Sequence, residues 1–308
     1  KKTGFHGLDV YSLVDSVDET VKHLHKINPS LASKVFDLYS CFEPFRHDEK
    51  EYARSLIKFP DGCREEVVTS LQEILKIKLK NEAHTSHLFN ALQNAKIVHN
   101  AEKYYRAMVS FNDNSWNVRD HHMMETLLML CEHYGKDSKG IVWEHNTHIG
   151  DYRATDMEMH GQINIGGLAR EAFGKENVSL VGFGTYSGTV IASHAWDGPI
   201  ETLPVPDAKS DSVEAICHDA ISDVGSVDFY LMFDQGIESS ILEEVKGHRA
   251  IGVVYHPEHE RRGNYVPTSL SRRYDAFIYL DETHSLTPLQ VGFDPRKFPE
   301  SYPFGSRV

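Results

Sequence analysis

One short stretch, residues 144–153, carries most of the side chains in this sequence that could do chemistry, and it reads Glu-His-Asn-Thr-His-Ile-Gly-Asp-Tyr-Arg. Near neutral pH an imidazole can take a proton from water or give one to a leaving group. Two imidazoles three positions apart could divide those tasks. We therefore predict that His145 and His148 are catalytic. The predicted binding or supporting residues around them are Glu144, Asn146, Asp151 and Arg153.

Two other roles for the histidine pair stay open. Both imidazoles could ligate a metal ion, with Asp151 or Glu144 as a third ligand, although the spacing differs from that of the HExxH zinc motif. The pair could also be structural, because a chain with 19 histidines contains close pairs by chance. No cofactor is expected, and a divalent metal ion remains an open alternative.

Further polar groups could take part in a site. The segment 256–260, His-Pro-Glu-His-Glu, could add an acid, a base or a metal ligand, but a solvated loop is the favoured interpretation. Tyr186 lies in a glycine-flanked connection and could donate a hydrogen bond to a ligand. Arg119 and Asp120 could form a capping ion pair or point into the site. The chain has no Gly-x-Ser-x-Gly elbow and no Walker A loop, which argues against a serine hydrolase and a P-loop enzyme.

Hydrophobic periodicity predicts a helical first half, followed by strands that alternate with helices. Residues 141–143, Ile-Val-Trp, are typical of a short buried strand that ends at the histidine pair. Ligands bind at the carboxyl ends of strands in open α/β sheets. The predicted helices are 12–27, 28–42, 48–58, 64–79, 81–108, 118–134, 156–173, 211–222 and 238–246, and the predicted strands are 141–143, 178–183, 189–192, 229–233, 250–255 and 276–280, with a loop at 256–273.

These elements predict an α/β fold with a parallel-rich sheet flanked by helices and a large helical insertion in the N-terminal half. Residues 1–135 would form a helical region over the site, and residues 136–308 would form the sheet region, the two making one compact domain. Because predicted helices occupy nearly everything before residue 141, we expect that an N-terminal part of the sheet is missing.

Composition and charge indicate which partners and which cellular location to expect. A formal net charge of −13 and the lack of a Lys/Arg-rich block argue against nucleic acid. No apolar run approaches the ~20 residues that span a bilayer, so no membrane partner is expected. The four cysteines lie too far apart for a CxxC pair and are predicted to be reduced thiols of a cytoplasmic protein. The oligomeric state stays unknown at this stage.

Motifs spread almost from end to end of the chain resemble the erythromycin esterase family, including its succinoglycan-biosynthesis relatives and those fused to phosphoribosyltransferases. The central match is Trp-x-His-Asn-x-His-Ile-Gly-Asp at 143–151. Others include Gly-Leu-Asp-Val-Tyr-Ser-Leu at 7–13 and Arg-Arg-Tyr-Asp-Ala-Phe at 272–277. The remaining matches are at 101–108, 116–123, 164–171 and 186–190.

The resemblance implies an α/β hydrolase that activates water directly against an ester, which is a macrolactone in the resistance enzymes. The histidines of the family's His-Asn-x-His motif fall on His145 and His148. Its main catalytic base belongs to an N-terminal Glu-Ala-x-His-Gly motif, supported by an acidic residue on a following strand. Neither occurs in these 308 residues. The first matching stretch, at Gly7, normally lies downstream of both, so we expect a chain that lacks its general base.

The leading hypothesis is thus an N-terminally truncated, erythromycin-esterase-like hydrolase of a small-molecule ester or macrolactone, with little activity by itself. His145 and His148 would orient water and the carbonyl or stabilise the oxyanion, while Asn146 would donate a hydrogen bond or hold the loop. Two alternatives remain: a metal-dependent hydrolase that uses His145 and His148, and a non-catalytic remnant that binds a ligand. The natural substrate is not determined by the sequence.

Overall fold

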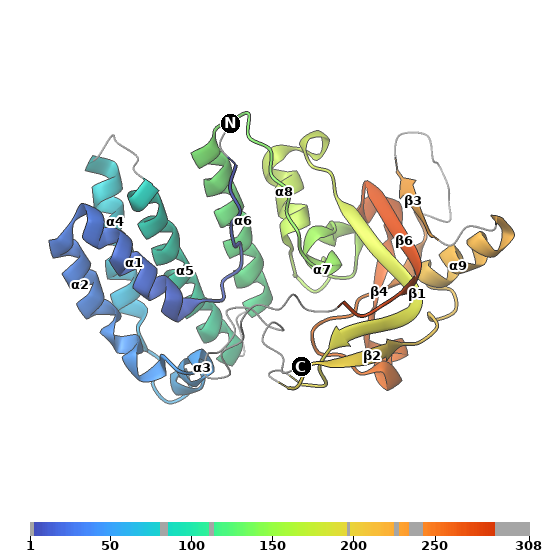
Figure 1. The fold of residues 1–308 in the computed structure, drawn as a ribbon, viewed down its shortest axis with the longest axis horizontal. Coiled ribbons are helices and arrows are strands. Elements are labelled where there is room, and N and C mark those ends of the chain that lie inside the picture. The colour runs from blue at the N-terminus through green and yellow to red at the C-terminus, as the bar shows by residue number, and fades with distance from the viewer. Residues whose placement is uncertain are drawn as a thin grey trace. The chain divides into compact units, whose positions relative to one another are not determined.

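The structure, a computed structural model, describes residues 3–80, 86–110, 114–195, 198–224, 228–233 and 243–286. The chain divides into two compact units, Lys1–Gly140 and Ile141–Val308. Figure 1 colours the first from blue to green and the second from green to red. Within the described ranges, no helix is both long and apolar enough to cross a membrane.

The first unit is built from helices, as the sequence predicts, and its large helical region is confirmed. The start of the predicted helix 81–108 lies outside the described residues. The observed elements are α1 (Leu13–Ile27), α2 (Pro29–Tyr39), the 3-10 helix η1 (Ser40–Phe45), α3 (Glu49–Leu56), α4 (Arg64–Lys80), α5 (Ser86–Val109) and α6 (Ser115–Tyr134).

Local chemistry sets the ends of these helices, and apolar faces join them. The Asn28 side chain accepts a hydrogen bond from the backbone N–H of Leu31 at 3.1 Å and so caps α2. Gly135 ends α6 at a φ of 96°, a region that favours glycine. Leu13 and Leu24 of α1 are fully buried in the core that α5 also lines. Burying each such side chain contributes roughly 1.5–3 kcal/mol.

A disulfide joins Cys41 in η1 to Cys63, which directly precedes α4. The prediction that all four cysteines are reduced is therefore wrong for this pair. Sequence spacing could not reveal it, because the two residues lie 22 positions apart and meet only once the intervening α3 has folded. Cys131 and Cys217 are free thiols. Disulfides persist mainly in oxidising compartments, so the cytoplasmic location stays only a prediction.

The second unit alternates strands with helices. Its helical elements are α7 (Asn146–Ile149), η2 (Tyr152–Ala154), α8 (Ile165–Phe173), η3 (Lys175–Asn177), α9 (Val213–Val224), η4 (Pro257–His259), α11 (Glu260–Gly263) and α12 (Leu270–Arg273). Its strands are β1 (Val181–Ala192), β2 (Glu201–Val205), β3 (Asp228–Met232), β4 (Val245–Arg249), β5 (Tyr265–Ser269) and β6 (Ala276–Thr283).

Four of the strands form one sheet in the order β2-β1-β6-β3, and β4 pairs with β5 in a separate hairpin. Only β1 and β6 pair in parallel among these described strands; β2 and β3 join the sheet antiparallel. The α/β class is confirmed, but the sheet is not parallel-rich. The physical reason at β2 is the short connection 193–200, because a parallel crossover needs a dozen or more residues.

The predicted strand at 141–143 is not formed. Ile141 and Trp143 are 96% and 87% exposed, and no described strand pairs with them. An apolar run becomes a strand only where a neighbouring chain accepts its backbone hydrogen bonds. The Trp143 ring nevertheless lies near Phe183 of β1, with 6.2 Å between ring centroids.

Other predicted boundaries also shift. The two short strands predicted within 178–192 are one continuous strand, since β6 pairs with β1 through the glycine-rich middle. Residues 250–255 form only an isolated bridge at Val254, because the hairpin strand β4 ends before them. The helix predicted at 156–173 begins at Ile165, where the Asn164 side chain caps it. The predicted loop 256–273 contains η4, α11, β5 and α12, and the predicted helix 238–246 lies mostly outside the described residues.

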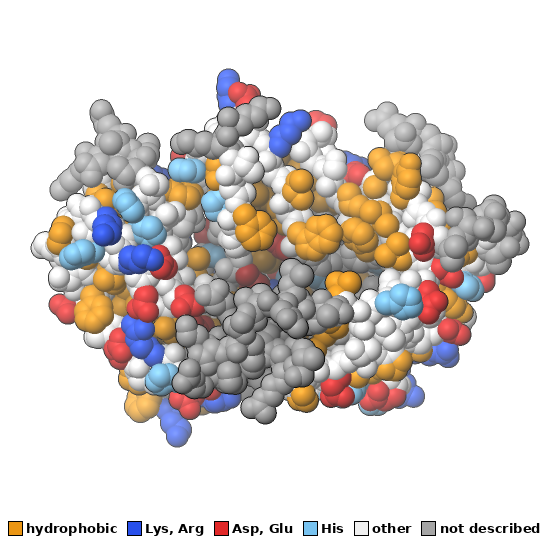
Figure 2. Space-filling view, in the orientation of Figure 1, with side chains coloured by type: hydrophobic (Ala, Val, Ile, Leu, Met, Phe, Trp, Pro, Cys, Tyr) orange, Lys and Arg blue, Asp and Glu red, His pale blue; other side chains and the backbone are white. Residues whose placement is uncertain are grey.

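The sheet buries one face and leaves apolar side chains on the other. Phe277 and Tyr279 of β6 are fully buried in a core that includes Cys217 and Ile221 of α9. On the opposite face the strand register places Phe183 beside Ile278 and Tyr230, and Val181 beside Ala276 and Met232. Figure 2 shows hydrophobic side chains gathered over these strands. The exposed ones are Val181, Phe183, Tyr230 and Met232, at 37%, 40%, 71% and 52%.

We expect the disulfide to stabilise the first unit. Closing a loop of 22 residues removes unfolded-state entropy worth about 3 kcal/mol. The double variant Cys41→Ser/Cys63→Ser should therefore unfold at lower urea concentration, with Cys131→Ser as the matched control. Peptide mapping without reductant should recover the linked pair. Free thiols at both positions in the oxidised, folded protein would contradict the pairing.

The exposed sheet face should bind hydrophobic dyes, because contiguous apolar patches of this kind are unusual on soluble monomers. Replacing Tyr230 and Met232 with Thr keeps strand propensity but removes apolar surface. This double variant should lower the fluorescence of bound anilinonaphthalene sulfonate, whereas Met159→Thr, on another exposed but isolated side chain, should change it little. Equal dye binding by both variants would show that the face is covered in solution.

Candidate active site

The first predicted histidine caps a very short helix. His145 precedes α7, and its Nδ1 accepts a hydrogen bond from the backbone N–H of Thr147 at 3.2 Å. A backbone N–H can only donate, so Nδ1 carries no proton in this arrangement. The proton therefore sits on Nε2, which donates to the carbonyl of Ile251 at 2.8 Å. Both ring nitrogens are thus engaged with the protein.

The surroundings of His145 favour its neutral form. Removal of the ring from bulk water lowers its pKa to about 4, although part of the residue remains exposed. The nearby positive charge of Arg273 acts in the same direction. At neutral pH this imidazole is therefore unprotonated, and its pKa lies well below the range that suits a general base.

The neighbouring Asn146 ties α7 to the edge of β1. Its Oδ1 accepts from the backbone N–H of Phe183 at 3.1 Å, and its Nδ2 donates to the carbonyl of the same residue at 2.6 Å. These are the two groups that an adjacent strand would pair with. Both polar atoms of the Asn146 amide are thus bonded to the β1 backbone, and the role of this residue stays a prediction.

Arg249, at the end of β4, provides hydrogen-bond donors for further backbone carbonyl groups of β1. Its guanidinium donates to the carbonyls of Thr185 and Tyr186, both at 2.7 Å, and to that of Pro206 at 2.7 Å. The charge is balanced by an ion pair with the buried Glu260. Side chains from distant parts of the chain thus bond to the β1 backbone.

A buried Glu–His pair lies behind Asn146. His248 of β4 and Glu214 of α9 are 1% and 0% exposed, and Nδ1 of the histidine lies 2.6 Å from the carboxylate. Glu214 also accepts from the backbone N–H of Arg249. These contacts hold the pKa of Glu214 below its usual value despite its burial. The other nitrogen of His248 lies 3.5 Å from the Asn146 amide nitrogen.

Sequence reasoning did not select this pair. The sequence predicts a helix over 211–222 and leaves residue 248 between a predicted helix and a predicted strand, so neither residue is marked as part of a site. The available signal was an acidic side chain among the apolar residues of the first turn of α9, together with His-Arg directly before an apolar run. An ionised carboxylate that orients an imidazole is a common device in hydrolases, but this histidine faces Asn146 and is closed to solvent.

Asp151 anchors a second buried network. Its carboxylate accepts two hydrogen bonds from the Arg153 guanidinium and one from Arg170 of α8, at 2.8–3.0 Å. Hydrogen bonds from these arginines hold the pKa of Asp151 below its usual value, although burial opposes them. Arg170 also pairs with Asp275 at 2.8 Å, so this network joins α8 to the segment before β6.

The backbone of α7 packs closely against α8 and Arg273. Arg273 is fully buried; its guanidinium donates to the carbonyl of Asn146 at 3.1 Å, and its backbone carbonyl accepts from the backbone N–H of Asp151 at 3.0 Å. A Cβ at Gly166 would lie 2.1 Å from the Ile149 carbonyl oxygen, so α8 can approach α7 only because this residue is glycine. His148 is itself buried at 6% exposure within this packing.

The remaining predicted residues are placed as follows. Glu144 is half-buried beside His145. Arg119 lies in the first unit and forms a bidentate pair with Asp9, at 2.9 and 2.7 Å, rather than the predicted capping pair. Its neighbour Asp120 is fully buried. Tyr186 stacks on His218 of α9, with 3.7 Å between ring centroids, and so packs on the helix-covered face of the sheet.

These observations define a helix-rich α/β protein that gathers imidazoles of both α7 and β4 beside its central strand. A family model described as erythromycin esterase matches residues 1–283. The chain belongs to the erythromycin esterase family.

Three solved structures share this fold over nearly the whole of this chain. A succinoglycan biosynthesis protein is 17% identical, with a TM-score of 0.72 over 92% of this chain and 66% of that one. A Bacillus cereus protein is 19% identical, with a TM-score of 0.74 over 92% and 67%. An erythromycin esterase mutant in its open conformation is 14% identical, with a TM-score of 0.60 over 90% and 68%. The chain thus spans about two thirds of each of these proteins.

The pKa of His145 predicts a pH effect on stability. Its folded value is about 4 and its ordinary value is 6.5, so between these values the unfolded chain binds more protons. The neutral imidazole's contribution is complete above pH 6.5 and is lost as the pH falls through that window. His145→Asn keeps a capping oxygen but does not titrate. In urea titrations it should lose less stability than wild type between pH 7 and pH 4.5.

His145→Ala is the control for the cap itself. It removes the acceptor for the Thr147 N–H and should cost about 1 kcal/mol at pH 7. An Asn variant with the full wild-type pH dependence would show that the ring of His145 is solvated and titrates normally.

Proposed function

We propose that this chain hydrolyses a small-molecule carboxylic ester or macrolactone. In this proposal His148 acts on the reacting carbonyl, and His145 positions His148. The observation that carries the proposal is the geometry of the turn 145–148: the backbone N–H of His148 donates to the carbonyl of His145 at 2.8 Å, and the side chain of Asn146, between them, lies 3.5 Å from His248, in a member of the erythromycin esterase family. Ester hydrolysis needs a donor for the oxyanion that forms when water attacks, and a histidine N–H can serve as that donor.

The two histidines have different parts in this proposal. His145 has a pKa of about 4 and bonds through both ring nitrogens, so it is a positioning residue that holds the first turn of α7. His148 lies one turn further, and its backbone N–H bonds to the carbonyl of His145 at 2.8 Å. Any shift of the cap would therefore move His148.

Asn146 and the Glu214–His248 pair support the same turn. Bonds from Asn146 to both backbone groups of Phe183 fix α7 to β1. The buried carboxylate of Glu214 keeps His248 oriented toward that amide. This arrangement is the preorganisation that oxyanion stabilisation requires, because donors that need not reorganise lower the barrier most.

The proton-accepting step is not assigned to any of these residues. The family's Glu-Ala-x-His-Gly motif is absent from the 308 residues, His145 is too weak a base, and the two ring nitrogens of His248 face Glu214 and the Asn146 amide. We therefore expect slow turnover by this chain alone. A metal-dependent mechanism on His145 would require its ring to give up the bonds to Thr147 or Ile251.

Binding and turnover should separate the two roles. An aryl phosphonate mimics the tetrahedral oxyanion, so its affinity, measured by calorimetry, reports oxyanion stabilisation even when turnover is slow. His148→Ala should weaken phosphonate binding and lower kcat/KM on activated aryl esters, by about 10²-fold or more. His145→Asn, which keeps the cap, should change both by less than about tenfold.

The controls discriminate the alternatives. His160→Ala, an exposed histidine outside the site, should behave as wild type. Wild-type binding and rates in His148→Ala would overturn the proposed role. Loss of activity on chelation with recovery on added Zn²⁺ would instead support the metal-dependent hydrolase. Binding without turnover of any ester would support the ligand-binding alternative.

A further inference from the structure

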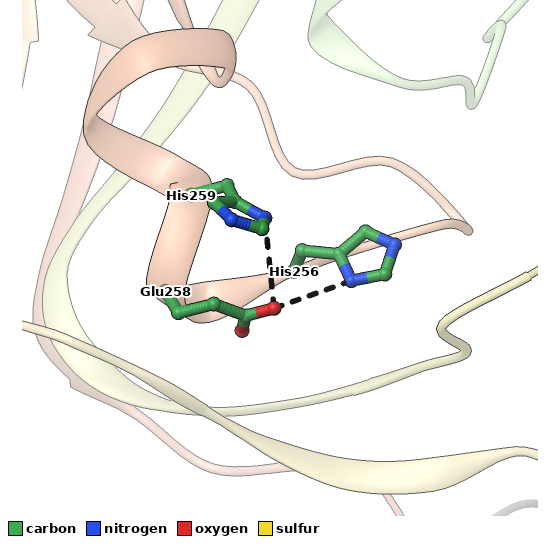
Figure 3. A group of neighbouring side chains, drawn as sticks. All are labelled: His256, Glu258 and His259. Atoms are coloured by element: carbon green, nitrogen blue, oxygen red, sulfur yellow. Dashed lines mark ion pairs between the residues drawn. The ribbon is translucent and has the colours of Figure 1, made fainter.

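A second cluster of histidines lies away from α7, on the segment that connects β4 to β5. The Glu258 carboxylate lies 3.5 Å from Nδ1 of His256 and 3.6 Å from Nδ1 of His259 (Figure 3). One donor atom from each of the three residues lies within 4.8 Å of the others. Both carboxylate–imidazole distances exceed the 2.7–3.2 Å typical of a hydrogen bond.

These distances match the geometry of a shared cation better than that of direct bonds. Imidazole nitrogens and carboxylate oxygens lie about 2.0–2.2 Å from Zn²⁺, so neighbouring ligand atoms of a tetrahedral ion are separated by roughly 3.3–3.6 Å. Two edges of such a tetrahedron are therefore already in place at Glu258. The third edge involves His259, whose side chain is 72% exposed and free to turn toward the others.

The backbone that carries these side chains is held at both ends. Tyr255 and Glu260, on either side of the cluster, are each 1% exposed. The backbone N–H of Tyr255 donates to the carbonyl of Ser193 at 2.8 Å, and Glu260 pairs with the buried Arg249. Pro257 opens the single turn of η4. The ligand atoms thus project from a fixed turn, which lowers the entropy lost when a metal ion binds.

A fourth imidazole is close. Ser193 and Val254 form a parallel bridge, which brings the end of β1 beside this segment. His194, which follows Ser193, has its ring centroid 5.1 Å from that of His256.

We propose that His256, Glu258 and His259 bind one divalent transition-metal ion of the Zn²⁺ class, with His194 or water as the fourth ligand. Imidazole and carboxylate donors suit this class rather than Ca²⁺ or Mg²⁺, which prefer oxygen ligands alone. The site is structural: with His194 as the fourth ligand, the ion would join the end of β1 to the β4–β5 connection. The same connection carries Ile251, whose carbonyl accepts from His145.

The test uses protein that carries no histidine tag and has been stripped with EDTA. Titration with ZnCl₂ in a calorimeter should show one site above background, and Zn²⁺ should raise the thermal unfolding midpoint. His256→Ala, Glu258→Gln and His259→Ala should each weaken binding by at least about tenfold, and His194→Ala by less. Circular dichroism of each variant without metal should match the wild type.

Two controls guard against binding elsewhere on a histidine-rich surface. The double variant Glu158→Gln/His160→Ala removes an exposed carboxylate and imidazole from another loop and should bind Zn²⁺ like the wild type. His23→Ala disrupts another close cluster, in which His23 lies 3.0 Å from His87 and 3.4 Å from Glu19. Its effect should also be small.

Unchanged affinity and stoichiometry in a His256→Ala/His259→Ala double variant would overturn the proposal, as would equal loss in the His23→Ala control. These measurements do not use esterase activity, so the metal site and the proposed catalytic function can fail independently.

Discussion

The central strand β1 has backbone hydrogen-bonding groups on an edge where, among the described strands, no neighbour pairs with it. β6 pairs along one side from Val181, but β2 joins the other side only from Gly188 onward. Unpaired N–H and C=O groups in a protein interior cost about as much as lost hydrogen bonds. Side chains meet this requirement here: the Asn146 amide pairs with Phe183, and the Arg249 guanidinium pairs with the carbonyls of Thr185 and Tyr186.

The candidate active site follows from that constraint. Because Asn146 must reach the edge of β1, α7 begins beside it, and His145 becomes the cap of a helix of only four residues. Because Arg249 must reach the same edge, β4 brings His248 next to Asn146. The imidazoles are thus gathered by residues whose first task is to satisfy backbone groups, and the buried Asp151–Arg170–Asp275 network fixes the other side of the same turn.

Electrostatics then separates histidines that look equivalent in sequence. His145 is neutral at pH 7, with a pKa lowered to about 4 by the partial removal of its ring from bulk water and by the nearby charge of Arg273, although part of the residue remains exposed. His248 is held by a buried carboxylate. His256 and His259 remain exposed on either side of Glu258. One residue type therefore serves as a helix cap, as an oriented partner and as a candidate metal ligand, according to burial and neighbouring charge.

Sequence alone determined the helical first half and the α/β class, while the site role of residues 144–153 stays a prediction. Helical periodicity and capping residues such as Asn28 act within a few positions, so local patterns reveal them. The family motif likewise needs only adjacent residues, and the family match over 1–283 confirms the resemblance.

Only the tertiary structure decided which apolar runs become strands and which polar residues meet. Ile141–Trp143 looks like a buried strand but is exposed, because strand formation depends on a partner far along the chain. The Cys41–Cys63 disulfide, the Glu214–His248 pair and the bond from Arg273 to Asn146 join residues 22, 34 and 127 positions apart. No local pattern encodes such contacts, since burial and long-range pairing arise only when separate elements pack together.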